Sequence, residues 1–425
     1  MIPSERTLSV WCNTYRVGTL RERNNLWAFE YAPDWSAFDM APALPRSAGT
    51  IVDGASSRPV QWFFDNLLPE EGARTLLAQD ARVEEADAFG LLAHFGAESA
   101  GALTLLHPDE SPVQGGRSAL AYDELSRRIR NLPNIPLSQG GSKRMSLAGA
   151  QHKLPVILED GELYEPGHSM PSTHILKPDH SRPDEYWHTA INEYFMMRLA
   201  RGCGFDVPDV ELIRVPEPVY LVRRFDRATD HGALTRLHTI DACQLLGIDR
   251  IYKYRQGVPS ILPAIVEQCR TPAVTRVTLF RWFIFNLLIG NTDNHLKNLS
   301  FMMRSDGIVL APHYDLVCTA VYERNNQWSN APLSWRFDGY SLLAGVDRYY
   351  IEALSDVLKV SGRMVDSTIR SLSKAVLNGA DALLTEIERT DYDGIAKSGE
   401  LRLLRQCRYG VMADMAGHLL GILPR

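Results

Sequence analysis

Residues 289–317 read I-G-N-T-D-N-H-L-K-N-L-S-F-M-M-R-S-D-G-I-V-L-A-P-H-Y-D-L-V, and they contain the polar residues that most constrain the fold and the chemistry of this chain. Asp293 is followed five residues later by Asn298. A short apolar run, a tight R-S-D-G turn and a second apolar run then lead to Asp315. Phosphoryl transfer from ATP needs such a set: one carboxylate orients the attacking hydroxyl, while an amide and a second carboxylate hold magnesium.

Asp293 is therefore the candidate general base, and Asn298 and Asp315 are the candidate magnesium ligands. The catalytic loop of protein kinases has the same D-x-x-x-x-N spacing before its metal-binding aspartate. Magnesium takes few protein oxygens and keeps phosphate oxygens and water, so two protein ligands suffice. The apolar stretch Val277–Ile289 predicts a core helix that presents the polar loop at its C-terminal end. The alternative is that Asp293 caps the following turn and Asp315 is an ordinary loop carboxylate.

The composition indicates a globular, cytoplasmic protein. The chain has 425 residues, 45% of them hydrophobic, which is enough for two or three domains with their own cores. A formal net charge of −6 argues against extensive coating of nucleic acid. The six cysteines are scattered and lack zinc spacing, which predicts unpaired thiols in a reducing compartment. The N-terminus has no apolar signal-peptide core, and the run Val277–Ile289 is too short to span a bilayer, so no membrane association is expected.

The pattern of apolar and turn residues predicts an α+β fold with three regions along the chain. Residues 1–115 read as an N-terminal subdomain, residues 116–225 as a small mixed α/β lobe, and residues 226–425 as a mainly helical lobe. The expected elements are strands at Leu8–Tyr15, Val17–Glu22, Leu26–Tyr31, Thr173–Lys177, Glu211–Arg214 and Val219–Val222, a hairpin of Leu154–Leu158 with Leu163–Tyr164, helices at Asp65–Ala78, Ala86–Phe95 and Glu185–Arg201, and a loop at His107–Arg117. After Arg223 we expect helices alone, except for the hairpin after Asn298.

Lys177 and Glu193 form a second candidate group. Lys177 ends the strand T-H-I-L-K, where a lysine can reach ATP phosphates, and the alternative is a solvated lysine at a strand end. Glu193 lies on a predicted helix among Thr189, Ala190 and two methionines, so its carboxylate is partly desolvated and needs a partner. An ion pair with Lys177 would match the strand-lysine to helix-glutamate pair of kinases. The alternative is that Glu193 only borders the apolar face.

A phosphate-binding loop is predicted at Ser146–Lys153, which reads S-L-A-G-A-Q-H-K. Its small residues let backbone N–H groups approach phosphate oxygens, and the alternative is a simple tight turn. A hinge that holds adenine by backbone groups is expected within Val222–Arg227, and two residues of the 293–298 loop are placed to touch nucleotide. The candidate nucleotide-binding residues are Ala148, Gly149, Ala150, Gln151, His152, Lys153, Lys177, Arg223, Arg224, Phe225, His295 and Lys297.

The chain resembles the HipA family of serine/threonine kinases, the toxin halves of bacterial toxin–antitoxin pairs. The motifs that carry the resemblance are F-D-N-L-L-P-E at Phe64–Glu70, F-G-A-E-S-A-G-A-L at Phe95–Leu103, S-L-A-G-A-Q-H-K at Ser146–Lys153, H-I-L-K-P at His174–Pro178, N-E-Y at Asn192–Tyr194, R-F-D-R at Arg224–Arg227, D-A-C-Q at Asp241–Gln244, G-N-T-D-N-H-L-K-N at Gly290–Asn298 and Y-D-L at Tyr314–Leu316. Several motifs in one order are far more specific than any one of them.

The resemblance implies a two-lobed protein-kinase-like fold with an N-terminal subdomain on the small lobe. It implies Asp293 as catalytic base, Asn298 and Asp315 on magnesium, and Lys177 on phosphates. It also implies self-phosphorylation at Ser146, which ejects the nucleotide loop in the family, because a dianionic phosphoserine does not stay packed beside ATP phosphates. The chain departs from the family where His152 replaces a common glutamate and Arg223 replaces a frequent acidic residue.

The resemblance also implies partners: a helix-turn-helix antitoxin of the HipB type, operator DNA reached through that antitoxin, and an aminoacyl-tRNA synthetase of the glutamyl type as substrate. Direct DNA contact by Arg363 and Arg370 is suggested by their charge alone. Two other classes stay open. One is a non-catalytic co-repressor bound to an antitoxin–DNA complex, and the other is a small-molecule or lipid kinase that shares the ATP site.

Overall fold

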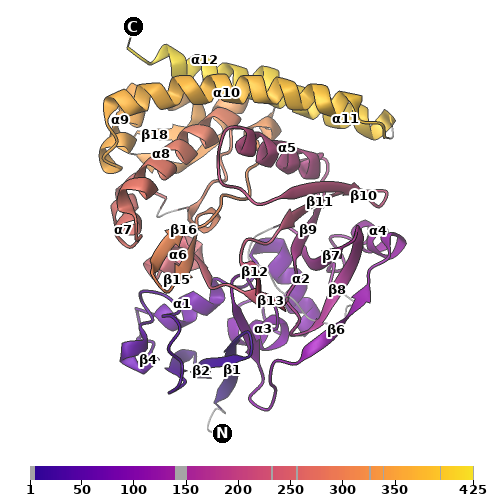
Figure 1. Ribbon diagram of the computed structural model, residues 1–425, viewed down its shortest axis with the longest axis vertical. Coiled ribbons are helices and arrows are strands. Elements are labelled where there is room, and N and C mark those ends of the chain that lie inside the picture. Colours follow the sequence, from indigo (N-terminus) through magenta and orange to yellow (C-terminus); the bar gives the residue numbers. More distant parts are fainter. Residues whose placement is uncertain are drawn as a thin grey trace. The chain divides into compact units, whose positions relative to one another are not determined.

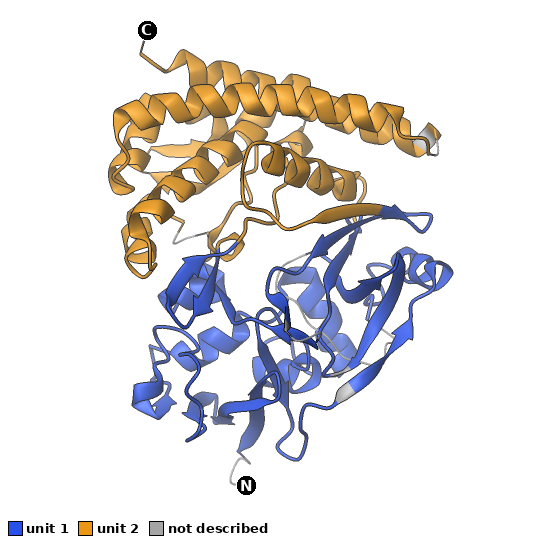
Figure 2. Ribbon diagram, viewed as in Figure 1, with its two compact units in different colours: residues 1–181, 213–252, 300–311 blue, residues 182–212, 253–299, 312–425 orange. Residues whose placement is uncertain are grey.

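The computed structural model describes residues 5–138, 151–230, 233–254, 257–324, 327–337, 339–392 and 394–424 (Figure 1). The chain divides into two compact units, which are coloured separately in Figure 2. Unit 1 contains Met1–Ser181, Ile213–Tyr252 and Ser300–Ala311, and unit 2 contains Arg182–Leu212, Lys253–Leu299 and Pro312–Arg425. Ser146 and the residues Ala148, Gly149 and Ala150 of the predicted phosphate loop lie outside the described residues.

Unit 1 begins with a five-stranded antiparallel sheet in the order β4-β3-β2-β1-β5. Asn24 and Asn25 make the turn between β2 and β3, and their φ values of 54° and 58° suit a tight hairpin. The strands are β1 (Arg6–Cys12), β2 (Tyr15–Arg23), β3 (Leu26–Tyr31), β4 (Thr50–Val52) and β5 (Leu103–Leu106).

Three helices accompany this sheet: α1 (Pro59–Asp65), α2 (Glu71–Ala81) and α3 (Ala88–Phe95). Their aromatic side chains meet the sheet, with ring centroids 5.2 Å apart for Trp27 and Phe89. The expected helix Asp65–Ala78 is wrong at its start, because α1 ends at Asp65 and α2 begins only at Glu71. Pro69 explains the interruption, since proline has no N–H and its ring clashes with the carbonyl of the preceding turn.

A second sheet has the order β10-β11-β9-β7-β8-β6 and packs on a core of leucines and valines that includes Leu125 of α4. The predicted hairpin around Asp160 is confirmed, since Glu159 pairs with Glu162. The expected loop His107–Arg117 instead gives way to edge strand β6 at Gln114. The elements are β6 (Gln114–Ala119), α4 (Tyr122–Arg130), β7 (Leu154–Glu159), β8 (Glu162–His168), β9 (His174–Pro178), β10 (Val210–Arg214) and β11 (Pro218–Arg223).

The expectation that only helices and one hairpin follow Arg223 is wrong. Short strands recur because T-I-D and A-L-T-R carry β-branched residues in runs too brief to show a period. The further elements of unit 1 are β12 (Arg227–Asp230), β13 (Ala233–Arg236), β14 (Thr239–Asp241), α6 (Ala242–Leu246), β15 (Ser300–Arg304) and β16 (Gly307–Leu310). The hairpin expected after Asn298 is β15–β16, and β14 pairs with its first strand.

Unit 2 is mainly helical, and its longest helix, α10, packs against α5, α8, α9, α11 and α12. A π-helical turn, Gln406–Met412, joins α11 to α12. The elements are α5 (Thr189–Gly202), α7 (Leu262–Glu267), α8 (Pro272–Ile289), β17 (Pro332–Phe337), β18 (Tyr340–Leu342), α9 (Arg348–Val357), α10 (Gly362–Arg389), α11 (Gly394–Arg405) and α12 (Ala413–Gly421). The helix expected at Glu185–Arg201 thus begins later, at Thr189.

Helix α8 is the core helix predicted before the polar loop, but it starts five residues earlier than Val277, with Pro272 in its first turn. At 18 residues the whole helix is longer than the run Val277–Ile289, and by length and composition alone it could cross a membrane. Most of it, 61%, is buried inside the structure, as in a core helix. Across the described residues, all six cysteines are free and buried, which confirms the expected unpaired thiols.

Candidate active site

The candidate base Asp293 lies on a loop that is fastened to the end of α8. The helix ends at Gly290, whose φ of 65° suits a left-handed cap. Three asparagine-mediated bonds follow: Asn286 Nδ2 donates to Trp282 O at 2.8 Å, Asn291 Nδ2 donates to Asn286 Oδ1 at 2.7 Å, and Asp293 N donates to Asn291 Oδ1 at 3.1 Å. The backbone of Asp293 is therefore fixed to a rigid helix, while its side chain is exposed.

Asn298, a candidate magnesium ligand, also contacts Asp293. Its Nδ2 donates to Asp293 O at 2.8 Å, and its N–H donates to His295 O at 3.0 Å. Because the amide nitrogen is committed, the Asn298 Oδ1 is the side-chain atom left to meet a cation. Oxygen is the donor type that magnesium prefers, and among the described residues no cluster of three or more His, Cys, Asp or Glu side chains forms a dedicated metal cage. The Asn298 amide oxygen thus fits the donor chemistry of magnesium that is shared with phosphates.

The second candidate ligand, Asp315, has an unusual backbone. Its φ is 56°, in the left-handed region that non-glycine residues seldom adopt, and such strain often marks functional sites. Its neighbour Tyr314 donates its hydroxyl to Lys297 O at 2.7 Å. Since Lys297 precedes Asn298, this bond ties the segments of the two candidate ligands together. The segments that carry Asp293, Asn298 and Asp315 are therefore joined in unit 2, and the role of the three side chains as base and magnesium ligands stays a prediction.

A threonine missed by the sequence analysis joins the two halves of this site. Thr319 Oγ1 accepts a hydrogen bond from Thr292 N at 2.7 Å and donates to Gly290 O at 3.2 Å. Ala320 N donates to the same carbonyl at 2.9 Å. The segment that follows Asp315 therefore holds the loop that carries Asp293. A hydroxyl residue four positions after a candidate ligand was the only signal for it in the sequence.

Asn192 of α5 also binds the segment that follows Asp315. Its Nδ2 donates to Cys318 O at 3.0 Å and to Tyr322 Oη at 2.9 Å, while Cys318 N donates to its Oδ1 at 3.0 Å. The side chain is fully buried, and the adjacent Glu193 is only 3% exposed. Burial of Glu193 was predicted from its helical neighbours. The N-E-Y motif that contains Asn192 supports the family resemblance, but the sequence alone does not indicate a role for Asn192.

Lys177 belongs to unit 1, on β9, directly opposite Tyr220 of β11. It is 5% exposed, and its Nζ lies 5.8 Å from the centroid of the Tyr220 ring. The alternative of a solvated strand-end lysine is therefore excluded. Its predicted partner Glu193 belongs to unit 2, so the Lys177–Glu193 pair stays a prediction.

The end of the predicted phosphate loop lies next to β9 in unit 1. Gln151 Nε2 donates to Pro178 O at 3.1 Å. His152 is half-buried, and burial lowers the pKa of its imidazole, which favours the neutral form. Gln151, His152 and Lys153 share a small hollow with Leu76 and Leu77, which belong to α2 of the N-terminal subdomain. The described part of the loop therefore sits between β9 and that subdomain.

The predicted hinge Arg223–Phe225 needs one correction. The guanidinium of Arg224 is 4% exposed and is bound to Asp226 at 2.6 Å and to Glu98 at 3.1 Å, so it does not reach toward a nucleotide. Its N–H is also used, since it donates to Thr173 O at 2.9 Å. Arg223 is exposed and Phe225 is half-buried. Their contact with nucleotide at the hinge stays a prediction.

Arg224 belongs to a buried charge cluster that links the N-terminal subdomain to the strands after the hinge. Glu98, with no exposed surface, accepts bonds from Arg224, from Arg227 at 2.8 Å and from Arg236 at 2.6 Å. Burial works against the charged form of Asp226, but the nearby arginines outweigh it and lower the pKa of this carboxyl. Burial and repulsion from Arg224 lower the pKa of Arg227 to about 10. The R-F-D-R motif therefore has a structural role in addition to marking the hinge.

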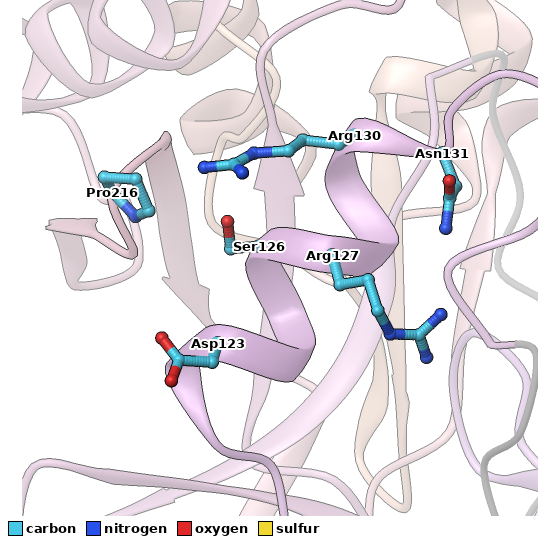
Figure 3. A pocket seen from close by; sticks show the side chains of 6 residues that line it. All are labelled: Asp123, Ser126, Arg127, Arg130, Asn131 and Pro216. Atoms are coloured by element: carbon cyan, nitrogen blue, oxygen red, sulfur yellow. The ribbon is translucent and has the colours of Figure 1, made fainter.

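A surface hollow of about 430 Å³ lies elsewhere on unit 1, along α4 and beside Pro216 (Figure 3). Its lining residues do not include any candidate site residue. Two of its arginines already have partners, because Arg127 pairs with Glu124 at 2.7 Å and Arg130 pairs with Glu217 at 2.6 Å. Figure 3 shows Ser126 and Arg130 on the side of the helix that faces Pro216. We assign this hollow no part in the site.

Comparisons with known proteins decide the family. A model described as the HipA N-terminal domain matches residues 8–106, and one described as the HipA-like C-terminal domain matches residues 145–378. The chain belongs to the HipA family. The serine/threonine-protein kinase toxin HipA of Shewanella oneidensis is 29% identical over 388 residues, which cover 86% of each chain. Y4mE of Sinorhizobium fredii, which is named as a kinase, is 37% identical over 331 residues, covering 75% of this chain and 78% of that one.

The solved structure of Shewanella oneidensis HipA, in complex with HipB and its operator DNA, has the same fold. The match has a TM-score of 0.78 at 24% identity and covers 98% of this chain and all of that one. The expected two-lobed kinase-like α+β fold is therefore confirmed. The sequence resemblance to the HipA family is likewise confirmed, and the chain's relatives place it in a family of serine/threonine kinase toxins.

Proposed function

We propose that this HipA-family chain is an ATP- and magnesium-dependent protein serine/threonine kinase, the toxin of a toxin–antitoxin pair. One observation carries the proposal. An exposed carboxylate, Asp293, lies on a loop fixed to a buried helix, and the Asn298 amide bonds to its backbone. The Tyr314–Lys297 bond ties the segment of the strained Asp315 to the same loop. Phosphoryl transfer depends mainly on positioning and on electrostatic stabilisation, which this arrangement supplies.

In this proposal each residue has a defined task. Asp293 accepts the proton of the acceptor hydroxyl, while the Asn298 Oδ1 and the Asp315 carboxylate hold magnesium. Lys177, oriented by Glu193, contacts nucleotide phosphates together with the loop Ala148–Lys153, and His295, Lys297 and the hinge backbone complete the nucleotide site. Magnesium, when bound, neutralises charge on the transferring phosphoryl group.

Self-phosphorylation at Ser146 is the proposed regulatory event. A phosphate of nearly two negative charges within the nucleotide loop repels ATP phosphates, so the modified enzyme loses nucleotide affinity. Ser146→Ala is the variant that tests this. Mass spectrometry of wild-type protein after incubation with ATP should find phosphate on Ser146, and labelling of the Ser146→Ala variant at the wild-type level would contradict it.

The partners of the protein follow from its relatives. The Shewanella structure contains HipA, HipB and operator DNA, which supports a HipB-like antitoxin as partner here and DNA contact through that antitoxin. A glutamyl-type aminoacyl-tRNA synthetase in the cytoplasm is the proposed substrate. Purified synthetases incubated with the protein and γ-labelled ATP test the substrate. Label on the glutamyl enzyme that disappears in Asp293→Asn is expected, whereas label on a lipid or small molecule alone would favour another kinase class.

A co-repressor without catalysis is the main competing class. If the protein were such a co-repressor, Asp293→Asn would shift antitoxin–DNA complexes in a gel as well as the wild type does. The variant would also leave any growth phenotype unchanged. The kinase proposal expects normal antitoxin binding by Asp293→Asn and loss of growth arrest. The two proposals therefore differ in the growth phenotype of Asp293→Asn, and the gel shift is the control that shows intact antitoxin binding.

A further inference from the structure

We infer that Tyr254 is a positioning residue for Asp293, and that its hydroxyl selects the carboxylate oxygen that receives the proton of the acceptor. This inference rests on the proposed kinase function. The observation is a direct contact: Tyr254 Oη donates a hydrogen bond to Asp293 Oδ1 at 2.5 Å. Both residues belong to unit 2, although they lie 39 positions apart in the sequence.

Tyr254 is held against the loop that it contacts. The residue before it, Lys253, accepts a backbone bond from Leu296 N at 3.3 Å, which fastens the tyrosine segment beside the 293–298 loop. The Tyr254 ring packs edge-on against the His295 ring, with centroids 4.9 Å apart and planes at 80°. Lys253 Nζ lies 5.0 Å from the centroid of the Tyr254 ring. Tyr254 is 41% exposed, so its ring is held on one side by these contacts while the hydroxyl reaches Asp293.

Gly257 connects Tyr254 to β17 through backbone hydrogen bonds. Gly257 N donates to Tyr254 O at 3.1 Å, and Arg336 N donates to Gly257 O at 2.9 Å. A side chain at Gly257 would lie only 2.5 Å from Ser334 O, so the two backbones are in close contact. The same strand reaches the loop of the base, because Ser334 Oγ donates to Thr292 O and Trp335 Nε1 donates to Asn294 O at 2.6 Å. One strand thus supports the tyrosine and the base.

The side-chain torsions of Asp293 are what remain to be fixed. Its backbone is set by Asn291 and Asn298, but these contacts leave the exposed carboxylate free to rotate. A charge-assisted hydrogen bond from a phenol is short and directional, so it holds one oxygen in place. Within the described part of the chain, Oδ2 accepts no hydrogen bond. That oxygen is left for the acceptor.

The chemical consequence concerns the acceptor hydroxyl. In the proposed transfer the new bond forms between the serine or threonine oxygen and the γ-phosphorus, while the bond from that phosphorus to the leaving ADP oxygen breaks. The hydroxyl proton goes to Asp293 Oδ2. A carboxylate whose other oxygen is held presents Oδ2 in one orientation, which raises the fraction of productive encounters. Tyr254 does not touch the reacting atoms, so it acts only through Asp293.

Tyr254→Phe tests the inference, because it removes the hydroxyl and keeps the ring on His295. Loss of a hydrogen bond to a charged group corresponds to a fall of about 10- to 100-fold in kcat. The KM for ATP should stay within about twofold, since the nucleotide contacts are unchanged. Tyr349→Phe is the matched control, because Tyr349 is 75% exposed on α9 of the same unit, and it should behave as wild type.

Each other outcome has a definite meaning. A Tyr254→Phe variant with wild-type kcat overturns the inference, and a faster variant shows instead that the hydroxyl blocks the acceptor position. Phosphate mapped to Tyr254 would make it an acceptor and would also overturn the positioning role. If the wild-type protein transfers no phosphate to any acceptor, the proposed kinase function itself is contradicted.

A measurement without catalysis tests the contact separately. The midpoints of thermal unfolding of Tyr254→Phe, Asp293→Ala and the double variant form a cycle, because each single change removes one partner of the bond. A contact in solution predicts that the double variant shifts by less than the sum of the single shifts. Strictly additive shifts would contradict the contact, whatever the kinase assay gives.

Discussion

Asn192 and Cys318 exchange two hydrogen bonds of 3.0 Å: the Asn192 amide donates to the Cys318 carbonyl, and the Cys318 N–H donates to the amide oxygen. Asn192 precedes Glu193 on α5, and Cys318 lies three residues after Asp315. The Asn192 amide therefore pairs with both the N–H and the carbonyl of Cys318, which is buried. The position of the helix that carries Glu193 is coupled in this way to the segment that carries a candidate magnesium ligand.

Asn192→Ala should lower the free energy of unfolding by about 2–5 kcal/mol, because it leaves two buried backbone groups without partners. Urea unfolding followed by circular dichroism measures this loss. Asn330→Ala is the control, since Asn330 is exposed and its side chain donates to Gln327, another exposed side chain. Equal stability of the two variants would show that the paired bonds do not hold the segment.

Thr319 should matter through its hydroxyl. Thr319→Val keeps the shape but removes the acceptor for Thr292 N and the donor to Gly290 O, so kcat should fall by about 10-fold or more. Thr319→Ser keeps the hydroxyl and should retain most of the activity. Steady-state kinetics of both variants provide the comparison, and loss of activity in the serine variant with full activity in the valine variant would assign the effect to packing of the methyl group.

Gly290→Ala should destabilise the protein by about 2–4 kcal/mol, because the position has a φ of +65° and a Cβ would lie 2.4 Å from Val411 Cγ1. Gly417→Ala provides a control of opposite sign. This glycine is inside α12 with nothing within 4 Å of a Cβ, so alanine should stabilise by about 0.5–1 kcal/mol. Urea unfolding of both variants measures the two changes, and a neutral Gly290→Ala would contradict the described cap.

Removal of the charge of Glu98 should be among the most destabilising single changes. Glu98→Gln leaves three buried arginines with only Asp226 as a carboxylate, at an expected cost of about 3–5 kcal/mol. Glu162→Gln, at an exposed position of β8, should cost less than about 0.5 kcal/mol. Thermal and urea unfolding compare the two, and similar midpoints would mean that the cluster is not maintained in solution.

His238 should make stability depend on pH. Burial, partly offset by a hydrogen bond to the Met40 carbonyl, lowers the pKa of this imidazole to about 4. The unfolded chain then binds a proton between about pH 6.5 and pH 4 that the folded chain does not bind. Stability therefore falls as pH drops through this window, by about 3 kcal/mol in total.

Urea unfolding at several pH values measures that slope. His238→Gln keeps a donor for Met40 but does not titrate, so its slope between pH 4 and 6.5 should be smaller than that of wild type. His107→Gln, at an exposed position, should leave the slope unchanged. A steeper or equal slope in His238→Gln would exclude this histidine as the source.

The local parts of the site could be predicted from the sequence. Asp293, Asn298 and Asp315 lie within 23 positions of one another, and the helix and hairpin between them have clear apolar periods. The burial of Glu193 also followed from its helical neighbours. Such features depend on contacts close in the chain, where spacing and periodicity carry the information.

The supporting contacts could not be predicted in the same way. Tyr254 reaches Asp293 from 39 positions upstream, and Asn192 reaches Cys318 across 126 positions. Glu98 meets its arginines across 126 to 138 positions. Contacts of this range are set by tertiary packing and leave no period in the sequence. The short strands after Arg223 were missed for a related reason, since runs of three or four residues are stabilised by their partners.

The most direct test of the kinase assignment is phosphoryl transfer by wild-type protein and by Asp293→Asn. Both would be purified in dephosphorylated form and incubated with γ-labelled ATP and magnesium, with phosphosites mapped by mass spectrometry and ATP binding measured by calorimetry. We expect label in the wild type alone, reduced by at least about 100-fold in the variant, with ATP affinity and fold retained. Equal labelling of the two proteins, or no labelling of wild-type protein that binds ATP and is supplied with acceptors, would contradict the account.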